Sequence, residues 1–267
     1  MDGRPIGVFD SGLGGLTVVR ALIDLLPDEH LVYFGDTGRF PYGPKPREDV
    51  LKYALEITEL LMGHGVKLVV VGCNSAAAAA LEELRARYDV PLSGVIEPGL
   101  RAAGRVTRTG RIGVIGTVGT IASGAYQRAA EALGSGVRLT CAACPGFVEF
   151  VEAGDVDSDQ VHVLAERLLA PVRAAGVDTL VLGCTHYPLL ARTISEVMGR
   201  EVVLVSSGEE TAFEVRSVLD AVGARRAAGA EPSQRLFLTS GDPALFRRLG
   251  AQFIGPEVDT VKAHTWN

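Results

Sequence analysis

The chain has 267 residues, of which 47% are hydrophobic and 6% aromatic, and its formal net charge at pH 7 is −6. A chain of this length can form one large core or two domains of ordinary size. The acidic balance disfavours nucleic-acid binding, which a basic domain with clustered Lys and Arg would indicate. We therefore expect a globular protein with no nucleic-acid partner.

No segment suggests export or membrane insertion. Residues 1–5 are polar and the apolar run after them is short, so we expect no signal peptide. No apolar stretch approaches the ~18 residues that cross a bilayer. We therefore expect a cytoplasmic protein with no membrane partner. Its four cysteines, Cys73, Cys141, Cys144 and Cys184, should then stay reduced.

Short β-branched runs alternate with helical patterns along the chain. The expected strands are residues 5–9, 31–34, 68–71, 92–95, 111–115, 138–142, 179–182, 201–205 and 235–238. Between them the pattern predicts helices over residues 16–26, 47–64, 75–88, 123–133, 159–175, 188–198 and 211–222. Strands that are apolar on both faces, each followed by a helix, indicate α/β architecture with parallel sheets.

Two short motifs recur in the same order. Residues 4–12 (RPIGVFDSG) resemble residues 110–119 (GRIGVIGTVG), and residues 71–75 (VGCNS) resemble residues 182–186 (LGCTH). The recurrence at nearly the same separation predicts duplicated halves.

The expected fold is therefore two pseudo-symmetric parallel-sheet α/β lobes with the active site in the cleft between them. We place the first lobe at residues 1–97 and 207–267, and the second at residues 98–206.

Cysteines occupy matching places in the two halves. Cys73 and Cys184 each follow an apolar strand and precede a helix, where ligands of open α/β sheets bind. Free N–H groups at a helix start attract an anion and lower the pKa of a neighbouring thiol from about 8.5. A lone cysteine there is usually a small buried hydrophobe. The matched pair instead favours two thiols on opposite walls of one cleft.

Cys141 and Cys144 form a Cys-x-x-Cys pair, which raises a redox or zinc alternative. A structural zinc site needs further ligands at knuckle spacing, and neither Cys73 nor Cys184 has such a neighbour. The pair fits strand packing followed by a turn at Pro145. We therefore expect no metal.

Two loops carry further candidates. The glycine-rich loop that starts at Asp10 lacks the P-loop and dinucleotide patterns, and its aspartate would repel phosphate. Asp10 can instead act as an acid or base, or bind an ammonium group. The stiff segment of residues 41–44 (PYGP) places Tyr42 where it could line a pocket.

Five motifs in register carry a family resemblance. Residues 9–16 (FDSGLGGL), 35–37 (GDT), 41–43 (PYG), 72–76 (GCNSA) and 183–188 (GCTHYP) together resemble bacterial glutamate racemases, of the aspartate/glutamate racemase superfamily. The resemblance implies cofactor-independent interconversion of L- and D-glutamate, the latter for peptidoglycan. It also implies a homodimer.

The resemblance assigns roles to single residues. Cys73 would serve the D-isomer and Cys184 the L-isomer, on opposite faces of the α-carbon. Asp10 would assist Cys73, and His186 with Glu152 would assist Cys184. The implied substrate ligands are Asp10, Ser11, Tyr42, Gly43, Asn74, Ser75, Thr117, Thr185 and His186.

Three alternatives remain open. The substrate could be aspartate or another amino acid, which pocket length would decide. The chain could be a thiol metal or redox protein that uses Cys141 and Cys144. Paired α/β lobes also fit a non-enzymatic amino-acid-binding protein.

Overall fold

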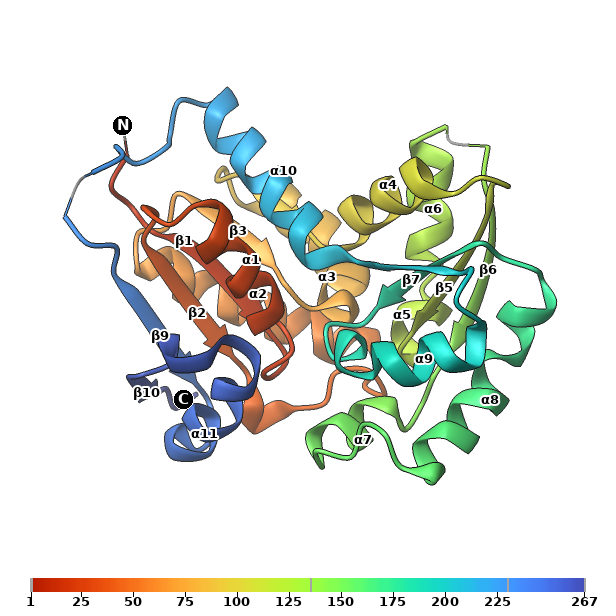
Figure 1. Ribbon diagram of the computed structural model, residues 1–267. Helices are drawn as coiled ribbons and strands as arrows, with labels where there is room; N and C mark the ends of the chain where they lie inside the picture. Colours follow the sequence, from red (N-terminus) through yellow and green to blue (C-terminus); the bar gives the residue numbers. More distant parts are fainter. Residues whose placement is uncertain (1, 135, 230, 267) are drawn as a thin grey trace. The chain divides into compact units, whose positions relative to one another are not determined.

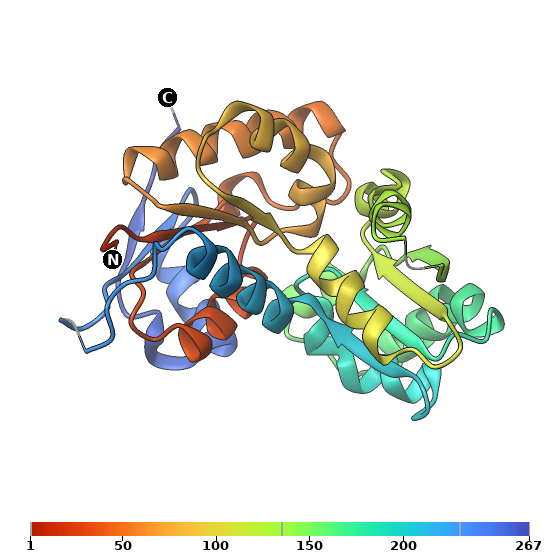
Figure 2. The ribbon, with the colours of Figure 1, turned by 90° about the horizontal axis from the view of Figure 1, so that it is seen from above.

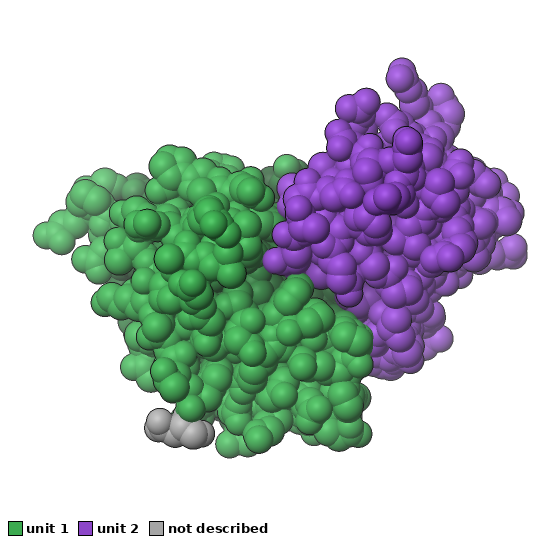
Figure 3. All heavy atoms as spheres, turned by 90° about the horizontal axis from the view of Figure 1, so that it is seen from below, with its two compact units in different colours: residues 1–95, 208–267 green, residues 96–207 purple. Residues whose placement is uncertain are grey.

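The computed structural model describes residues 2–134, 136–229 and 231–266, and the chain divides into two compact units. Unit 1 comprises residues 1–95 and 208–267, and unit 2 comprises residues 96–207 (Figures 1 and 3). The expected boundaries, after residues 97 and 206, differ by one or two residues. Ile96 opens a helix that packs on the sheet of unit 2, so it belongs there. Ser207 lies against Gly99 of that same helix.

Unit 1 contains a six-stranded parallel sheet in the order β10-β9-β2-β1-β3-β4. Its strands are β1 (Ile6–Asp10), β2 (Leu31–Gly35), β3 (Leu68–Val71), β4 (Leu92–Gly94), β9 (Arg235–Thr239) and β10 (Val261–Ala263). The central strands β1, β2 and β3 are buried along their whole length. Strands that hide both faces need helices on both sides of the sheet.

Those helices form two layers in unit 1. Helices α2 and α3 pack together on one face, and α1 and α11 pack together on the other (Figure 2). The helical elements are α1 (Leu16–Leu25), η1 (Thr37–Arg39), α2 (Arg47–Gly63), α3 (Asn74–Arg87), α10 (Ser207–Ala221), α11 (Pro243–Ile254) and η3 (Gly255–Glu257).

Unit 2 contains a four-stranded parallel sheet in the order β6-β5-β7-β8. Its strands are β5 (Arg111–Gly116), β6 (Arg138–Ala143), β7 (Thr179–Gly183) and β8 (Val203–Ser206). Helices α4 and α6 pack together, as do α8 and α9. The helical elements are α4 (Ile96–Val106), α5 (Val118–Ala122), α6 (Ala125–Ala132), α7 (Phe147–Glu152), α8 (Asp159–Ala174), η2 (Tyr187–Leu190) and α9 (Ala191–Met198).

The two sheets share one topology. The order β2-β1-β3-β4 in unit 1 corresponds to β6-β5-β7-β8 in unit 2. Register corresponds as well, because Ile6 pairs with Leu68 and the repeat-equivalent Ile112 pairs with Thr179. The prediction of two pseudo-symmetric parallel-sheet lobes is confirmed.

Within the described ranges, no helix has both the length and the apolar composition needed to cross a membrane.

Candidate active site

The expected site residues fall into two groups, one in each unit. Unit 1 holds Asp10, Ser11, Tyr42, Gly43, Cys73, Asn74 and Ser75, and unit 2 holds Thr117, Glu152, Cys184, Thr185 and His186. In each unit, two central strands end beside each other, β1 and β3 in unit 1 and β5 and β7 in unit 2. The cysteine of each group follows the carboxyl end of one of them, β3 in unit 1 and β7 in unit 2.

In unit 1, the thiol of Cys73 lies at the junction between β3 and α3. Cys73 occupies the N-cap of α3 with an extended backbone (φ −96°, ψ 122°). Because β1 and β3 pair with Phe9 opposite Val71, the residues after them come together. The Cys73 Sγ donates a hydrogen bond to Ser11 Oγ at 3.6 Å.

The environment of Cys73 favours the protonated thiol. Burial raises the pKa of Cys73 to about 12, and the negative charge of Asp10 adds to that shift. Backbone N–H groups of Ala76 and Ser11 act in the opposite direction but do not outweigh it. The helix start therefore lowers the pKa of this thiol as expected, through the Ala76 N–H, but the net pKa is raised, not lowered. Desolvation and a like charge dominate at this site.

Asp10 is fully buried at the end of β1. Its Oδ1 accepts a hydrogen bond from the Gly12 N–H at 2.8 Å. A Cβ at Gly15 would stand 2.5 Å from the Asp10 Cβ, so only glycine allows the loop to approach the carboxylate this closely. The glycine-rich loop thus serves to enclose Asp10.

Tyr42 is buried, with 1% of its surface exposed, and its hydroxyl donates to Asp36 Oδ2. Burial and the charge of Asp36 raise the pKa of the Tyr42 phenol, so it stays protonated and does not act as a base. The charge of Cys73 contributes to the same shift, which places Tyr42 within electrostatic reach of that thiol. Among the described residues, the N–H groups of Tyr42 and Gly43 have no hydrogen-bond acceptor. Such N–H groups can bind an anion.

Asn74 and Ser75 form the first turn of α3 and are buried. Their side chains therefore stand at the same helix start as the Cys73 thiol.

In unit 2, Cys184 directly follows β7 and is 7% exposed. The Nδ1 of His186 lies 4.0 Å from the Cys184 Sγ. The Nε2 of the same ring lies 2.7 Å from Glu152 Oε1, at the end of α7. A carboxylate on one ring nitrogen orients the imidazole and selects its tautomer. The series of side chains Glu152, His186 and Cys184 can therefore move a proton to or from the thiol.

Two threonines complete this group. Thr117 follows β5 and caps α5, where its Oγ1 accepts from the Thr120 N–H at 3.3 Å. Thr185 is buried directly beside Cys184.

Cys141 and Cys144, the Cys-x-x-Cys pair, have hydrogen bonds and pKa shifts of their own. The Sγ of Cys141 accepts from the Gln127 amide at 3.4 Å, and the carbonyl of Cys144 accepts from the Tyr187 hydroxyl at 3.1 Å. Burial raises the pKa of Cys141 to about 11 and that of Cys144 to about 12, with a contribution from Cys184 at Cys144. Among the described residues no group of three or more His, Cys, Asp or Glu side chains could hold a metal ion.

The sequence predicts no role for Asp36, nor for Arg39, Ser240 and Trp266 beside it. This carboxylate is fully buried after β2 and binds side chains from three parts of the chain, Arg39 and Tyr42, Ser240, and Trp266. Its place at the carboxyl end of a central strand was the available signal. Nothing local indicated the contact with Trp266, which lies 230 residues away in sequence.

Two lobes of one topology, each with a buried thiol at an equivalent strand end, define a class of α/β protein with a matched pair of thiols. A family model described as Asp/Glu/Hydantoin racemase matches residues 6–212. The chain is 54% identical over 258 residues to the glutamate racemase of Mycobacterium leprae. The aligned region covers 97% of this chain and 94% of that protein.

Solved structures agree with this match. A glutamate racemase isoform of Bacillus anthracis superposes with a TM-score of 0.93 at 39% identity, covering 100% of this chain and 98% of the other. A glutamate racemase of Francisella tularensis in complex with D-glutamate gives a TM-score of 0.92 at 30% identity, covering 99% and 98%.

The chain belongs to the Asp/Glu/Hydantoin racemase family. It is an amino-acid racemase and hence an isomerase, as the resemblance implied.

Proposed function

We propose that this enzyme interconverts L- and D-glutamate through proton transfer at the α-carbon, with Cys73 and Cys184 as the two acid–base groups. Relatives named glutamate racemase, one of them in complex with D-glutamate, support glutamate as the substrate. One observation carries the mechanism. Each lobe places a buried cysteine at the equivalent strand end, after β3 in one and after β7 in the other.

Inversion of a stereocentre explains why two thiols are needed. A proton removed from one face of the α-carbon and returned to the same face would restore the starting isomer. One cysteine, as thiolate, takes the α-proton, and the other, as thiol, delivers its own proton to the opposite face. The roles exchange in the reverse direction. Cys73 would remove the proton of D-glutamate and Cys184 that of L-glutamate, with no cofactor taking part.

Asp10 would activate Cys73. The carboxylate lies close enough to raise the thiol pKa, and it can take the thiol proton as the thiolate forms. The ammonium group of glutamate, bound near Asp10, would offset the charge that now opposes ionisation of Cys73. Substrate binding would therefore prepare the base.

His186 would activate Cys184. If Glu152 accepts the Nε2–H, then Nδ1 is left to accept the thiol proton at the 4.0 Å site. Glu152 thereby positions the imidazole and stabilises its charged form.

The carbanionic transition state needs donors that are fixed before the reaction. The main-chain N–H groups of Tyr42 and Gly43 would bind one carboxylate of glutamate. Other polar groups would bind the second carboxylate and the amine: Asp10, Ser11, Asn74, Ser75, Thr117, Thr185 and His186. Removal of one such donor costs about 10²–10³ in rate in other enzymes.

The proposal also covers the cellular role, the location and the oligomeric state of the enzyme. D-Glutamate would be supplied to peptidoglycan from a cytoplasmic homodimer. Light scattering of the purified protein tests the dimer, which requires twice the 28.1 kDa mass of the chain.

Exchange of the α-proton in D₂O tests the function. We expect NMR to show loss of the α-proton signal from either L- or D-glutamate. The circular dichroism signal of the glutamate should decay to zero as the mixture becomes racemic. The same assay on aspartate should be far slower. Absence of exchange from glutamate would contradict the proposal, and faster exchange from aspartate would favour the aspartate alternative. A binding protein without catalysis would show no exchange at all.

A further inference from the structure

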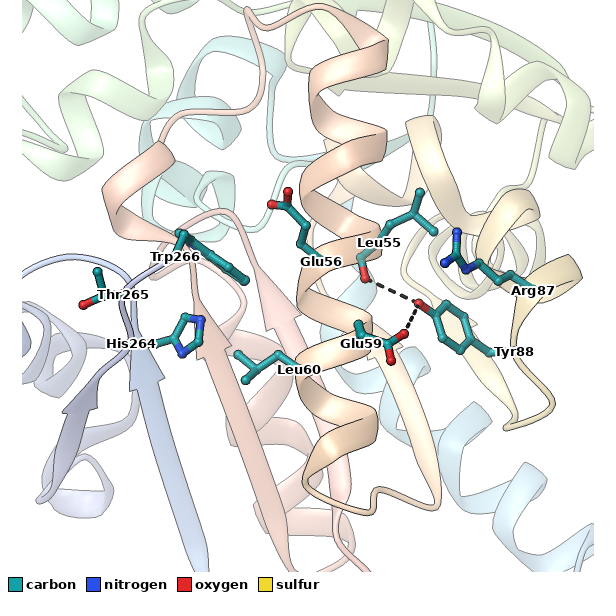
Figure 4. Close-up of a pocket in the computed structure, with 9 residues that line it drawn as sticks. All are labelled: Leu55, Glu56, Glu59, Leu60, Arg87, Tyr88, His264, Thr265 and Trp266. Atoms are coloured by element: carbon teal, nitrogen blue, oxygen red, sulfur yellow. Dashed lines mark hydrogen bonds between the residues drawn. The ribbon is translucent and has the colours of Figure 1, made fainter.

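The last residues of the described chain reach the loop that follows β2. Trp266 lies just beyond β10, and its Nε1–H donates to Asp36 Oδ1 at 3.3 Å. Figure 4 shows the indole standing beside helix α2, near Glu56. The C-terminal segment is thus bound to a buried carboxylate of the central sheet.

Arg39 joins the same contact. Its guanidinium carbon lies 4.1 Å from the ring centroid of Trp266 and 4.1 Å from that of Tyr53. Its Nε donates to Asp36 Oδ2 at 2.7 Å, and its Nη1 donates to Glu56. At this distance the negative face of each aromatic ring attracts the guanidinium charge. We call Asp36, Arg39 and Trp266 the C-terminal clasp.

Asp36 has no exposed surface, so its charge depends on donors from the protein. Oδ1 accepts from the Ser240 hydroxyl at 2.6 Å and from Trp266, and Oδ2 accepts from Arg39 and from the Tyr42 hydroxyl. Each donor constrains the orientation of the carboxylate. The clasp therefore determines where the Tyr42 hydroxyl is held.

Tyr42 connects the clasp to the substrate. With its hydroxyl bound to Asp36, the residue has its main-chain N–H, together with that of Gly43, to offer a ligand. A shift of the carboxylate would move the Tyr42 side chain and both N–H groups with it. Donors displaced by even about 1 Å bind and orient a substrate poorly.

We propose that Trp266 and Arg39 are positioning residues for glutamate. They hold Asp36 so that Tyr42 presents its main-chain N–H groups to a substrate carboxylate, and the C-terminal segment thereby sets substrate affinity. This inference rests on the proposed function, because it assumes that the Tyr42 segment binds glutamate.

The surroundings of Trp266 supply a matched control. A cavity of about 610 Å³ in unit 1 is lined by Leu55, Glu56, Glu59, Leu60, Arg87, Tyr88, His264, Thr265 and Trp266 (Figure 4). The Tyr88 hydroxyl donates to Glu59 at 3.1 Å and approaches the Leu55 carbonyl at 3.5 Å. Tyr88→Phe removes a polar contact from the same cavity without touching the clasp.

The test compares KM with kcat for Trp266→Ala, Arg39→Lys and Tyr88→Phe. We expect the first two to raise KM for glutamate about tenfold, which corresponds to about 1.4 kcal/mol, with kcat changed much less. Arg39→Lys keeps the charge but loses the planar stacking surface, so it tests the clasp even if Trp266→Ala does not fold. Tyr88→Phe should keep the KM of the unmodified enzyme.

Loss of folded enzyme would lower the apparent kcat at constant KM. A raised KM with little change in kcat therefore indicates misplaced substrate donors and not an unstable variant. A double-mutant cycle sharpens the result, because Trp266→Ala should add little to KM once Tyr42→Phe has removed the link to Asp36. An unchanged KM in both clasp variants, or full additivity in the cycle, would overturn this inference. Failure of the unmodified enzyme to exchange the α-proton of glutamate would instead overturn the proposed function.

Discussion

Cys73 and Cys184 are one residue type in two different electrostatic environments. Cys73 has the fully buried carboxylate of Asp10 close by, and the Cys184 sulfur has an imidazole nitrogen at 4.0 Å. A carboxylate raises the pKa of a thiol, whereas an imidazole can exchange a proton with it. The two lobes therefore share a topology but not the surroundings of their thiols, and in the mechanism that we propose each thiol ionises with the help of a different group.

The first residue-scale prediction concerns the pH at which Cys73 reacts. Because its pKa is raised to about 12, the thiolate fraction in the free enzyme should rise about tenfold per pH unit until the pH approaches that value. Asp10→Asn removes the charge that adds to the shift. We therefore expect faster alkylation of Cys73 by iodoacetamide in Asp10→Asn than in the unmodified enzyme at the same pH. Peptide mass spectrometry measures the rate.

Cys141 serves as the internal reference in that experiment. Burial alone raises its pKa to about 11, so Asp10→Asn should leave its alkylation rate unchanged. An equal increase at both cysteines would point to general loosening of the fold, and no increase at Cys73 would contradict the role given to Asp10.

The sequence predicts where a residue lies when that position follows from the repeat. Cys73 and Cys184 were each expected between a strand and a helix, and the structure places them there. The role of the Asp36 environment was not predictable in the same way. Its donors Ser240 and Trp266 lie 204 and 230 residues away, and only the folded sheet places β9 beside β2 and β10 beside β9.

At the scale of elements, the ends of the central strands depend on close packing. A Cβ at Gly183, the last residue of β7, would stand 2.6 Å from the Ile115 carbonyl and 3.0 Å from the Tyr126 hydroxyl. Neither neighbouring backbone nor a buried ring can move away easily. The next residue is Cys184, so packing at this glycine determines where the thiol is held.

Gly183→Ala should therefore lower both stability and turnover. Overpacking of this kind costs about 1–3 kcal/mol, which thermal unfolding detects as a lower Tm. Gly104→Ala is the matched control, because Gly104 lies within α4 and a Cβ there meets nothing within 4 Å. Alanine is the better helix former by about 1 kcal/mol, so this variant should be at least as stable as the original. Equal behaviour of the two variants would contradict the packing argument.

The elements that the sequence predicted correctly are the long, strongly patterned ones, such as α2, α3 and α8 with their adjoining strands. Short strands such as β4 were predicted as well, whereas helices α4, α5, α7 and α11 and strand β10 were not. Helices α5 and α7 have five and six residues, and isolated helices of that length are unstable without tertiary contacts. The helix expected over residues 188–198 begins instead as the 3₁₀ turn η2, with Pro188 in its first turn, and becomes α-helical at Ala191.

At the scale of the whole molecule, the two units differ in what the C-terminal segment adds. Unit 1 extends the shared four-strand order with β9 and β10, and the chain beyond β10 carries Trp266 to Asp36. In the parts of the chain that the structure describes, the clasp has no counterpart in the four-stranded sheet of unit 2. The duplicated halves thus share a core and differ in the extension that we assign to substrate positioning.

The central claim is that one thiol from each lobe serves the same α-carbon, and turnover of single-cysteine variants tests it most directly. We expect Cys73→Ala and Cys184→Ala each to lose at least about 10²-fold in kcat for glutamate. The double variant should be about as slow as either single one, since groups that act as a unit are not additive. Cys141→Ala should keep most of the activity. Substantial turnover in either Cys73→Ala or Cys184→Ala, or an equal loss in Cys141→Ala, would contradict the account.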